Sequence, residues 1–377
     1  MTKDKFESQA QSLLNKAGIK INGKNSWDIK VNNSRIYQRV FSQGTLGLGE
    51  SYMDGDWDCK QLDVFFYKVL SSKLDRDLKI TLPLIINILK AKLINLQSKS
   101  RAFEIGEKHY DAGNDLYSLM LDKRLTYTCG YWEWGAKNLD KAQEDKLELT
   151  CRKLNLKPGQ KILDIGCGWG SFAKYAAEKY KVKVIGITVS KEQVKLAKEI
   201  CKGLDVEIRL QDYRNLDKNE KFDHIVSLGM FEHVGVKNYK EYMKVANKHL
   251  KDEGLFLLHT IGGDISSNST DPWIEKYIFP NSMLPSIKQI AESIEGLFVM
   301  EDWHNMSANY DKTLMSWYKN ISSNWNNLDK HKYNGRFRRM WEYYLLSCAA
   351  GFRARNLQLW QIVLSKNGVP NGYKSIR

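Results

Sequence analysis

A glycine-rich turn is the first feature of the sequence that could bind a ligand. Residues 163–172 read LDIGCGWGSF, an apolar run that passes through three closely spaced glycines into a stretch of helical spacing. Glycine lets a chain turn sharply and lets its backbone approach a ligand closely. The spacing Gly-x-Gly-x-Gly, with Asp164 before the first glycine, differs from the Gly-x-Gly-x-x-Gly pattern of dinucleotide-binding proteins. A tight strand-to-helix turn without a ligand is the structural alternative.

Polar residues also recur within apolar or aromatic surroundings, which is where chemistry is expected. The segments are residues 109–122, 125–132, 229–235, 256–263 and 305–313. Glu232 follows the fourth strand predicted below and His259 ends the fifth, so both are expected at the carboxyl edge of a parallel sheet, where ligands bind. Each also has a structural explanation, Glu232 as a carboxylate at a helix N-terminus and His259 as a hydrogen-bonded histidine at a strand end.

The elements that must position these residues alternate from about residue 157 onward. Apolar runs of strand length are separated by stretches of helical spacing, which indicates a parallel sheet covered by helices on both faces. We therefore predict an α/β, Rossmann-like, doubly wound fold with a mixed sheet. The predicted strands are 161–165, 183–188, 206–210, 224–228, 255–260, 297–303 and 357–366, and the predicted helices are 171–180, 191–201 and 238–250. The aromatic-rich segment 308–355 is too long for a plain connection and is expected to be a helical insertion near the C-terminus that covers the site.

The N-terminal residues differ in pattern, and we expect a small α+β domain at 1–99 and a catalytic domain at 100–377, joined by a polar linker at 97–101. Strand-like pieces lie around 29–31 and 38–41, followed by a glycine-rich, turn-rich segment at 44–58. The apolar run 80–96 contains a proline, an asparagine and two lysines, so it predicts an amphipathic helix rather than a membrane span. Packing on its own domain is the favoured role of this helix, and contact with lipid is the alternative.

The composition fits a protein with a sizeable core and a basic surface. Of 377 residues, 42% are hydrophobic, and the net charge is +14. A basic surface attracts nucleic acid or an anionic membrane, but no zinc-finger spacing or RNA-binding aromatic pattern supports nucleic acid. The six cysteines form no CxxC pair and fit reduced thiols in a cytosolic protein. The first residues contain no long apolar stretch, so no signal peptide is expected.

The glycine loop resembles motif I of class I S-adenosylmethionine-dependent methyltransferases, and this resemblance implies that S-adenosylmethionine is the cofactor. Thr128 stands where serine is common, which keeps the hydroxyl group. The second strand ends in Thr188 without the acidic residue that commonly holds the ribose hydroxyls, so Thr188 and Gln193 are candidates for that role. The positions at which the resemblance implies cofactor contact are Tyr127, Thr128, Asp164, Gly166, Gly168, Gly170, Thr188, Gln193, Gln211, Asp212 and Tyr213.

Segments spread over nearly the whole chain resemble the bacterial cyclopropane-fatty-acyl-phospholipid synthases, a family similar to the mycolic acid cyclopropane synthases. They include GLGESYMDG (47–55), GMFEHVG (229–235), FLLHTIGG (256–263), DPWIEKYIFPN (271–281) and FRARNLQLWQ (352–361). The resemblance implies transfer of a methylene from S-adenosylmethionine across the cis double bond of an unsaturated acyl chain in a membrane phospholipid. In that reaction the alkene attacks the sulfonium methyl, a carbocation forms, and a base removes a proton as the ring closes.

In this family the base is thought to be a bicarbonate ion. The resemblance places the ion against Glu232, His259, Tyr310 and the backbone of Cys129 and Ile261. A glutamate can lie beside an anion if His259 or the bicarbonate hydroxyl donates a proton into a hydrogen bond. No step needs a thiolate, so Cys129 is not expected to be a nucleophile. Cys348 could line the acyl slot, although core packing is the favoured explanation, and no metal ion is implied.

The resemblance further implies a homodimer in the cytoplasm that associates peripherally with the inner face of the cytoplasmic membrane and binds no nucleic acid. Lipid contact and regulation are the roles expected of residues 1–99. The segment RFRRMW (336–341) combines cations with aromatic rings and is either an interfacial patch or the solvated face of a helix. Asp56 stands where the family has an aromatic residue, which argues against a lipid contact at that position.

Three other functions share part of this pattern. An enzyme on the same scaffold could leave a methyl branch on the acyl chain or methylate a small amine. A non-catalytic lipid-binding protein would share the apolar slot, but lipid carriage needs no polar set such as Glu232, His259 and Tyr310. A basic RNA methyltransferase would carry a base-stacking motif of the Asn-Pro-Pro-Tyr type after the fourth strand, where this chain has GMFEHVG.

Overall fold

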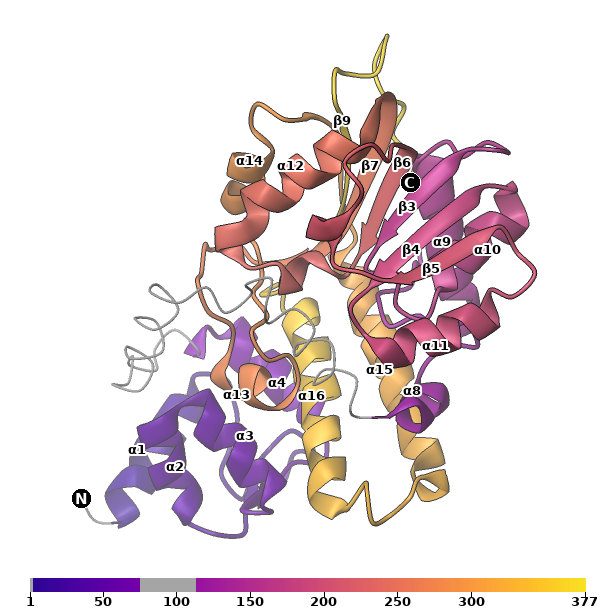
Figure 1. Ribbon diagram of the computed structural model, residues 1–377. Coiled ribbons are helices and arrows are strands. Elements are labelled where there is room, and N and C mark those ends of the chain that lie inside the picture. Colours follow the sequence, from indigo (N-terminus) through magenta and orange to yellow (C-terminus); the bar gives the residue numbers. More distant parts are fainter. Residues whose placement is uncertain (1–2, 75–112) are drawn as a thin grey trace. The chain divides into compact units, whose positions relative to one another are not determined.

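The chain is built from two units, each assembled from separate stretches of sequence. The computed structural model describes residues 3–74 and 113–377, so the helix predicted at 80–96 and the linker predicted at 97–101 lie outside the described residues (Figure 1). The first unit comprises Met1–Ile94, Ser269–Pro280 and Leu314–Leu357, and the second comprises Asn95–Asn268, Asn281–Thr313 and Gln358–Arg377. Most of the segment expected as an insertion in the catalytic domain thus belongs to the same unit as the N-terminal residues.

A seven-stranded sheet forms the centre of the second unit, in the order β5-β4-β3-β6-β7-β9-β8 (Figure 1). β9 runs antiparallel to β7 and β8, and the other pairs are parallel. The mixed, doubly wound sheet predicted from the sequence is confirmed, although β6 and β7 are longer than predicted. The strands are β3 (Lys161–Ile165), β4 (Lys183–Thr188), β5 (Val206–Leu210), β6 (Phe222–Leu228), β7 (Leu250–Gly262), β8 (Val299–Asn305) and β9 (Gln358–Ser365).

Helices cover both faces of this sheet because its strands carry apolar side chains in both directions. On one face, Tyr242 and Ile290 come from α12 (Tyr239–His249) and α14 (Ile287–Ile294) and pack on the strands. On the other face, Leu147 and Phe172 come from α9 (Leu139–Lys153) and α10 (Ser171–Tyr180). The remaining elements of this unit are α8 (Asn114–Met120), α11 (Lys191–Ile200) and the short 3-10 helices η2 (Tyr213–Asn215), η3 (Phe231–His233) and η4 (Val236–Asn238).

The first unit is mainly helical, and its helices overturn two details of the sequence-based prediction. Residues 38–41, predicted as a strand, lie in a helix, and so does much of the segment 44–58 that was predicted to be turns. Its described elements are α1 (Lys3–Asn15), β1 (Lys30–Val31), α2 (Arg35–Gln43), α3 (Thr45–Met53), β2 (Trp57–Asp58), α4 (Leu62–Ser71), α13 (Pro272–Tyr277), η5 (Trp325–Asn327) and α16 (Gly335–Arg353). The helix α15 (Ser307–Asn324) contributes its first residues to the second unit and the rest to the first.

The glycines of α3 serve close packing rather than turns. A Cβ atom at Gly47 would lie 2.2 Å from the carbonyl oxygen of Arg39, and one at Gly49 would lie 2.3 Å from the indole ring of Trp273. Neither distance is sterically possible, so only glycine lets α3 approach α2 and α13 so closely. The ring of Tyr343, from α16, lies 4.4 Å from that of Trp273 between ring centroids.

Aromatic rings from distant parts of the sequence fill the core of the first unit. The ring centroid of Tyr343 in α16 lies 5.7 Å from that of Tyr52 and 5.0 Å from that of Phe66. Tyr52 also contacts Trp57 at 5.1 Å. Such pairs add roughly 0.5–1.5 kcal/mol each beyond the area they bury. The C-terminal helix α16 is therefore part of the core around the N-terminal residues.

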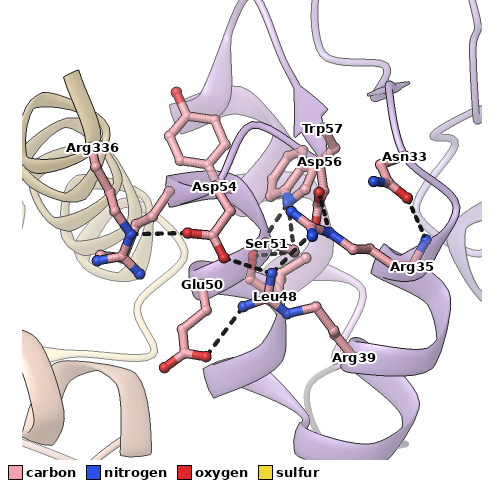
Figure 2. A network of polar contacts seen from close by, with 12 residues as sticks. Asn33, Arg35, Arg39, Leu48, Glu50, Ser51, Asp54, Asp56, Trp57 and Arg336 are labelled. Atoms are coloured by element: carbon pink, nitrogen blue, oxygen red, sulfur yellow. Dashed lines mark hydrogen bonds and ion pairs between the residues drawn. The ribbon is translucent and has the colours of Figure 1, made fainter.

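A network of ion pairs ties the helices of the first unit together (Figure 2). The guanidinium group of Arg39 lies 3.2 Å from Glu50, 2.8 Å from Asp54 and 3.1 Å from Asp56. Asp56 is 2% exposed and also accepts hydrogen bonds from Arg35 at 2.7 and 2.8 Å. Asp56 is therefore the buried centre of an ion-pair network.

The cations of RFRRMW (336–341) also have partners within the first unit. Arg336 binds Asp54 at 2.9 Å (Figure 2), and Arg339 binds Asp58 at 2.8 Å and donates to the backbone carbonyl of Trp57 at 2.7 Å. These contacts support a structural role for the two arginines, and an interfacial role for this segment stays a prediction. Within residues 3–74 and 113–377, no helix combines the length and the hydrophobicity that crossing a membrane requires.

Candidate active site

The glycine loop joins the end of β3 to the start of α10. The backbone N–H groups of Gly166 and Cys167 both donate to the carbonyl of Ile187 in β4, at 2.9 and 3.1 Å. Gly166, Gly168 and Gly170 have φ values of +83°, +55° and +84°, which disfavour residues with a Cβ atom. A Cβ atom at Gly168 would meet no atom within 4 Å, so this backbone borders open space. The loop thus has the form that a ligand-cradling backbone requires.

Aromatic rings lie beside this loop. Tyr117 contacts Tyr127 at 5.0 Å and Trp169 at 5.1 Å between ring centroids. The indole N–H of Trp169 donates to the side chain of Asn114 at 3.3 Å, which anchors the ring to α8. The faces of such rings attract cations. Tyr127, predicted to contact the cofactor, therefore belongs to an aromatic cluster next to the loop.

The ends of β4 and β5 bring together three more predicted residues. The Thr188 hydroxyl donates to Gln193 Oε1 at 2.7 Å, and the backbone N–H of Gln211 donates to the carbonyl of Thr188 at 2.9 Å. Gln193 is buried, and its Nε2 has no hydrogen-bond partner in the described part of the chain. A buried amide with a free donor is costly unless a ligand satisfies it. Thr188 and Gln193 thus bind each other beside the end of β4, and contact of either with ribose stays a prediction.

Asp212 and Tyr213 are arranged differently from each other. Asp212 forms a two-pronged ion pair with Arg214, in which its oxygens accept at 2.7 and 2.8 Å from the guanidinium group. The ring of Tyr213 packs against Tyr242 at 5.0 Å, as part of the hydrophobic core. Packing therefore explains the burial of Tyr213, and contact of either side chain with a cofactor stays a prediction.

Glu232 and Ile261 meet directly. Glu232 lies in η3 just after β6, and its Oε1 accepts a hydrogen bond of 2.7 Å from the backbone N–H of Ile261 in β7. The backbone of His259 is close to the same turn, since its carbonyl accepts from the N–H of Gly229 at 2.9 Å. The backbone N–H of Met283 donates to the carbonyl of Glu232 at 2.7 Å. Three of the five residues predicted to hold the proton acceptor thus lie on β7 or just after β6, and their contact with such an ion stays a prediction.

Burial sets the charge states of the two side chains. It raises the pKa of the Glu232 carboxyl group to about 7, and it lowers the pKa of His259 well below 6.5, with Lys146, Lys153 and His304 adding to the effect. His259 is therefore neutral at pH 7, and Glu232 can carry a proton. Glu232 Oε2 and both ring nitrogens of His259 are buried without a hydrogen-bond partner among the described residues. They are free to bind a small polar species.

Cys129 and Tyr310 lie on segments that contact one another. The Thr313 hydroxyl, in α15, accepts a hydrogen bond of 3.1 Å from the backbone N–H of Gly130 and lies 3.7 Å from the Cys129 sulfur. Asn309, the residue before Tyr310, accepts from the backbone N–H of Trp132 at 2.8 Å. Burial raises the pKa of the Cys129 thiol far above its usual range, so a thiolate nucleophile is disfavoured. Cys348 lies in α16 of the first unit, and its contact with an acyl chain stays a prediction.

Comparison with known proteins decides the family. The family model for mycolic acid cyclopropane synthetase matches residues 97–362. The chain is 54% identical, over 374 residues, to the cyclopropane-fatty-acyl-phospholipid synthase of Escherichia coli K12, covering 99% of this chain and 97% of that protein. The chain belongs to the cyclopropane synthase family. It is also 34% identical to cyclopropane mycolic acid synthase 2 of Mycobacterium leprae, covering 70% of this chain and 94% of that one.

Solved structures agree with this family. The mycolic acid cyclopropane synthase CmaA1, crystallised with SAH and CTAB, matches with a TM-score of 0.63 and 31% identity and covers 70% of this chain and 98% of its own. The second unit thus has the fold of S-adenosylmethionine-dependent methyltransferases, as predicted. The chain is accordingly an enzyme of the cyclopropane synthase family rather than a non-catalytic lipid carrier or an RNA methyltransferase.

The buried lysine Lys146 was not predicted from the sequence as part of the site. Lys146 in α9 is fully buried and donates to the Thr128 hydroxyl at 2.8 Å. Burial lowers the pKa of Lys146 to about 8, although the nearby Asp122, Cys129 and Asp164 favour the charged form and raise it. Burial likewise raises the pKa of Asp164 to about 7, and Asp164 Oδ2 has no hydrogen-bond partner in the described chain. The only sequence feature that indicates the burial of Lys146 is its position on the core-facing side of α9. Sequence alone does not distinguish such a lysine from a solvated one.

Proposed function

We propose that the chain is a cyclopropane-fatty-acyl-phospholipid synthase that uses S-adenosylmethionine to convert the cis double bond of a phospholipid acyl chain into a cyclopropane. The observation that carries this proposal is the buried pairing of Glu232 with the backbone of Ile261, two residues along β7 from a neutral His259 whose ring nitrogens have no hydrogen-bond partner among the described residues. A cyclopropane synthase needs a buried, positioned proton acceptor, and this arrangement supports one. The identity of 54% with a protein of that name supports the same function.

The residues around the glycine loop suit the cofactor. The open backbone at Gly168 offers a cradle, and Gln193 Nε2, which has no hydrogen-bond partner among the described residues, offers a donor. The rings of Tyr117, Tyr127 and Trp169 offer faces that tolerate a sulfonium cation. When bound, S-adenosylmethionine supplies an electrophilic methyl group. The chain's own residues then orient the ligand, keep water out and hold the proton acceptor.

The proton acceptor in this proposal is a bicarbonate ion held by Glu232, His259, Tyr310 and the backbone of Cys129 and Ile261. The raised pKa of Glu232 removes the difficulty of placing a carboxylate beside an anion, because the protonated carboxyl group can donate a hydrogen bond. The neutral His259 can accept a hydrogen bond from the hydroxyl of the ion through one ring nitrogen. The ion is thereby held with an unprotonated oxygen available for the departing proton.

The substrate and its membrane complete the proposal. An acyl double bond lies within a bilayer, so the enzyme must dock on the membrane and draw the chain into an apolar slot, to which Cys348 could contribute. The net charge of +14 suits an anionic surface, where each nearby lysine or arginine contributes about 1 kcal/mol. We propose a homodimer on the inner face of the cytoplasmic membrane, in which residues 1–99 provide lipid contact and regulation.

Product analysis tests the function. The protein is incubated with S-adenosylmethionine and liposomes of a monounsaturated phospholipid, and the fatty acids are analysed by mass spectrometry. A gain of one CH₂ unit with loss of the alkene, without a reductant, is expected. An added methyl branch would indicate the rival acyl methyltransferase, and methylation of an amine substrate alone would refute the proposal. Glu232→Gln should retain binding of S-adenosylhomocysteine and lose most turnover, by about 100-fold or more; normal turnover would refute the assignment of the acceptor site.

A further inference from the structure

Three polar side chains form a row across the antiparallel strands of the second unit. Gln361 of β9 is the register partner of His259 in β7 and of His304 in β8. Residues directly opposite one another in a sheet project from the same face, with Cβ atoms about 4.5–5.5 Å apart. All three are buried, Gln361 fully so. His259 therefore has an amide as its immediate neighbour and a second imidazole beyond it.

The helix α9 covers this row with a polar stripe. Lys146, Thr150 and Lys153 are spaced four and three residues apart, so they share one helix face. Lys153 Nζ lies 3.0 Å from His304 Nδ1, and a protonated lysine donates this hydrogen bond, which leaves the proton of a neutral His304 ring on Nε2. The charged or titratable groups that face His259 are Lys146 and Lys153 of α9 and His304 of β8. They disfavour a second proton on His259.

Hydrogen bonds from α9 orient the amide of Gln361. The Thr150 hydroxyl donates its only proton to the carbonyl of Lys146 at 2.8 Å. It can therefore only accept from Gln361, whose Nε2 lies 3.3 Å away. This fixes the amide so that Oε1 is the acceptor left over, and Oε1 is buried without a hydrogen-bond partner among the described residues. His259 is the neighbour of Gln361 in the sheet, and both of its ring nitrogens are likewise buried without a hydrogen-bond partner among the described residues.

We propose that Gln361 is a positioning residue for catalysis: its Oε1 accepts an N–H from the His259 ring when the site is loaded. A neutral imidazole has one donor and one acceptor nitrogen, so this hydrogen bond fixes the tautomer of His259. The other nitrogen then accepts from the hydroxyl of the bound proton acceptor. This inference rests on the proposed function. It adds Gln361 and Thr150 to the site as residues that act on His259 and do not contact the ligand themselves.

The decisive variant is Gln361→Met, which keeps the length of the side chain and removes the acceptor. The kcat is expected to fall by about 10- to 100-fold, as for other residues that orient a functional imidazole, while the KM values for S-adenosylmethionine and lipid change less than twofold. Gln361→Glu restores an acceptor and should recover part of the kcat. Because a carboxylate favours the imidazolium form, the acid limb of its kcat profile should move to higher pH.

A matched control exists on the same sheet. The Nε2 atom of Gln160 lies 3.1 Å from Nε2 of the buried His224. Gln160 directly precedes β3 and His224 lies near the start of β6, at the opposite end of these strands from the glycine loop. Gln160→Met removes an equivalent glutamine from an equivalent histidine and should leave kcat unchanged. If Gln361→Met does not fold, Thr150→Val serves instead, because it keeps Gln361 and removes only the group that orients it. A smaller loss of kcat at constant KM is expected.

The tautomer can be observed directly by ¹⁵N NMR of histidine-labelled protein, with the His259 signals assigned from a His259→Gln sample. With S-adenosylhomocysteine and bicarbonate bound, one tautomer is expected in the wild type and a mixture in Gln361→Met. A kcat equal to wild type in Gln361→Met, or an unchanged single tautomer, overturns the inference while the proposed function stands. Absence of cyclopropane product from the wild type would instead overturn the proposed function, and the tautomer measurement would still report on Gln361.

Discussion

Replacing Glu232 by glutamine is expected to stabilise the protein at pH 8 while removing its activity. Burial raises the pKa of this carboxyl group from 4.5 to about 7. Between these two values the folded protein holds a proton that the unfolded chain has released, so the free energy of unfolding falls as the pH rises through this window. At about 1.4 kcal/mol per pKa unit, the carboxylate costs about 3 kcal/mol once the pH exceeds 7. A glutamine has no such titration, and its Oε1 still accepts from Ile261.

Urea denaturation of the wild type and Glu232→Gln at a series of pH values measures this effect. The free energy of unfolding of the variant, minus that of the wild type, should grow by about 2.5 kcal/mol between pH 5 and pH 8. Other groups that titrate in this range, such as Asp164, are present in both proteins and cancel in the difference. Glu292→Gln, at an exposed pair with Lys288, should show no such trend. A difference independent of pH would refute the reasoning that Glu232 is desolvated in the folded state.

Three further predictions test the loop, the ion-pair network and the membrane surface. Gly168→Ala and Gly203→Ala both add a Cβ at positive φ that meets no atom within 4 Å, so each should cost about 1–2 kcal/mol of stability in thermal denaturation. Only Gly168→Ala should raise the KM for S-adenosylmethionine, by about tenfold or about 1.4 kcal/mol; equal KM values would exclude the loop from the binding site. Asp56→Ala should lower the free energy of unfolding of the first unit by about 3–5 kcal/mol, whereas Lys288→Ala should change stability by less than about 0.5 kcal/mol in the same urea titration. Sedimentation with anionic liposomes should weaken as salt rises from about 50 to 500 mM, and salt-independent binding would contradict electrostatic docking.

The sheet of the second unit was predictable because its strands are short, apolar and bounded by turns. β3, β4 and β5 have the predicted ends, since a parallel strand buried on both faces shows as an unbroken apolar run. The first unit was less predictable. Val40 and Phe41 favour a strand by local propensity, yet they lie in α2, whose buried residues are Ile36 and Tyr37. Gly49 of α3 suggested a turn because its true role, contact with Trp273, depends on a residue more than two hundred positions away in the sequence.

Some residues of the candidate site could likewise be predicted from the sequence, and others could not. Glu232 and His259 were predictable because Glu232 follows β6 and His259 lies near the end of β7, and the carboxyl ends of these parallel strands must meet at one edge. Lys146 and Gln361 were not, because their roles depend on the burial of α9 against the sheet and on the register between β7 and β9. A lysine or glutamine in a sequence is exposed in most proteins, and only tertiary packing makes it otherwise.

The aromatic core of the first unit has a consequence for how the protein is made. Tyr52 and Phe66 leave the ribosome early, whereas Tyr343, which packs against both, is synthesised near the end of the chain. At usual translation speeds the interval is on the order of tens of seconds. Throughout that time the nascent N-terminal helices carry rings that have not met their partner. The newborn chain is therefore expected to rely on a chaperone until its last helix emerges, and early termination of translation should yield an insoluble fragment.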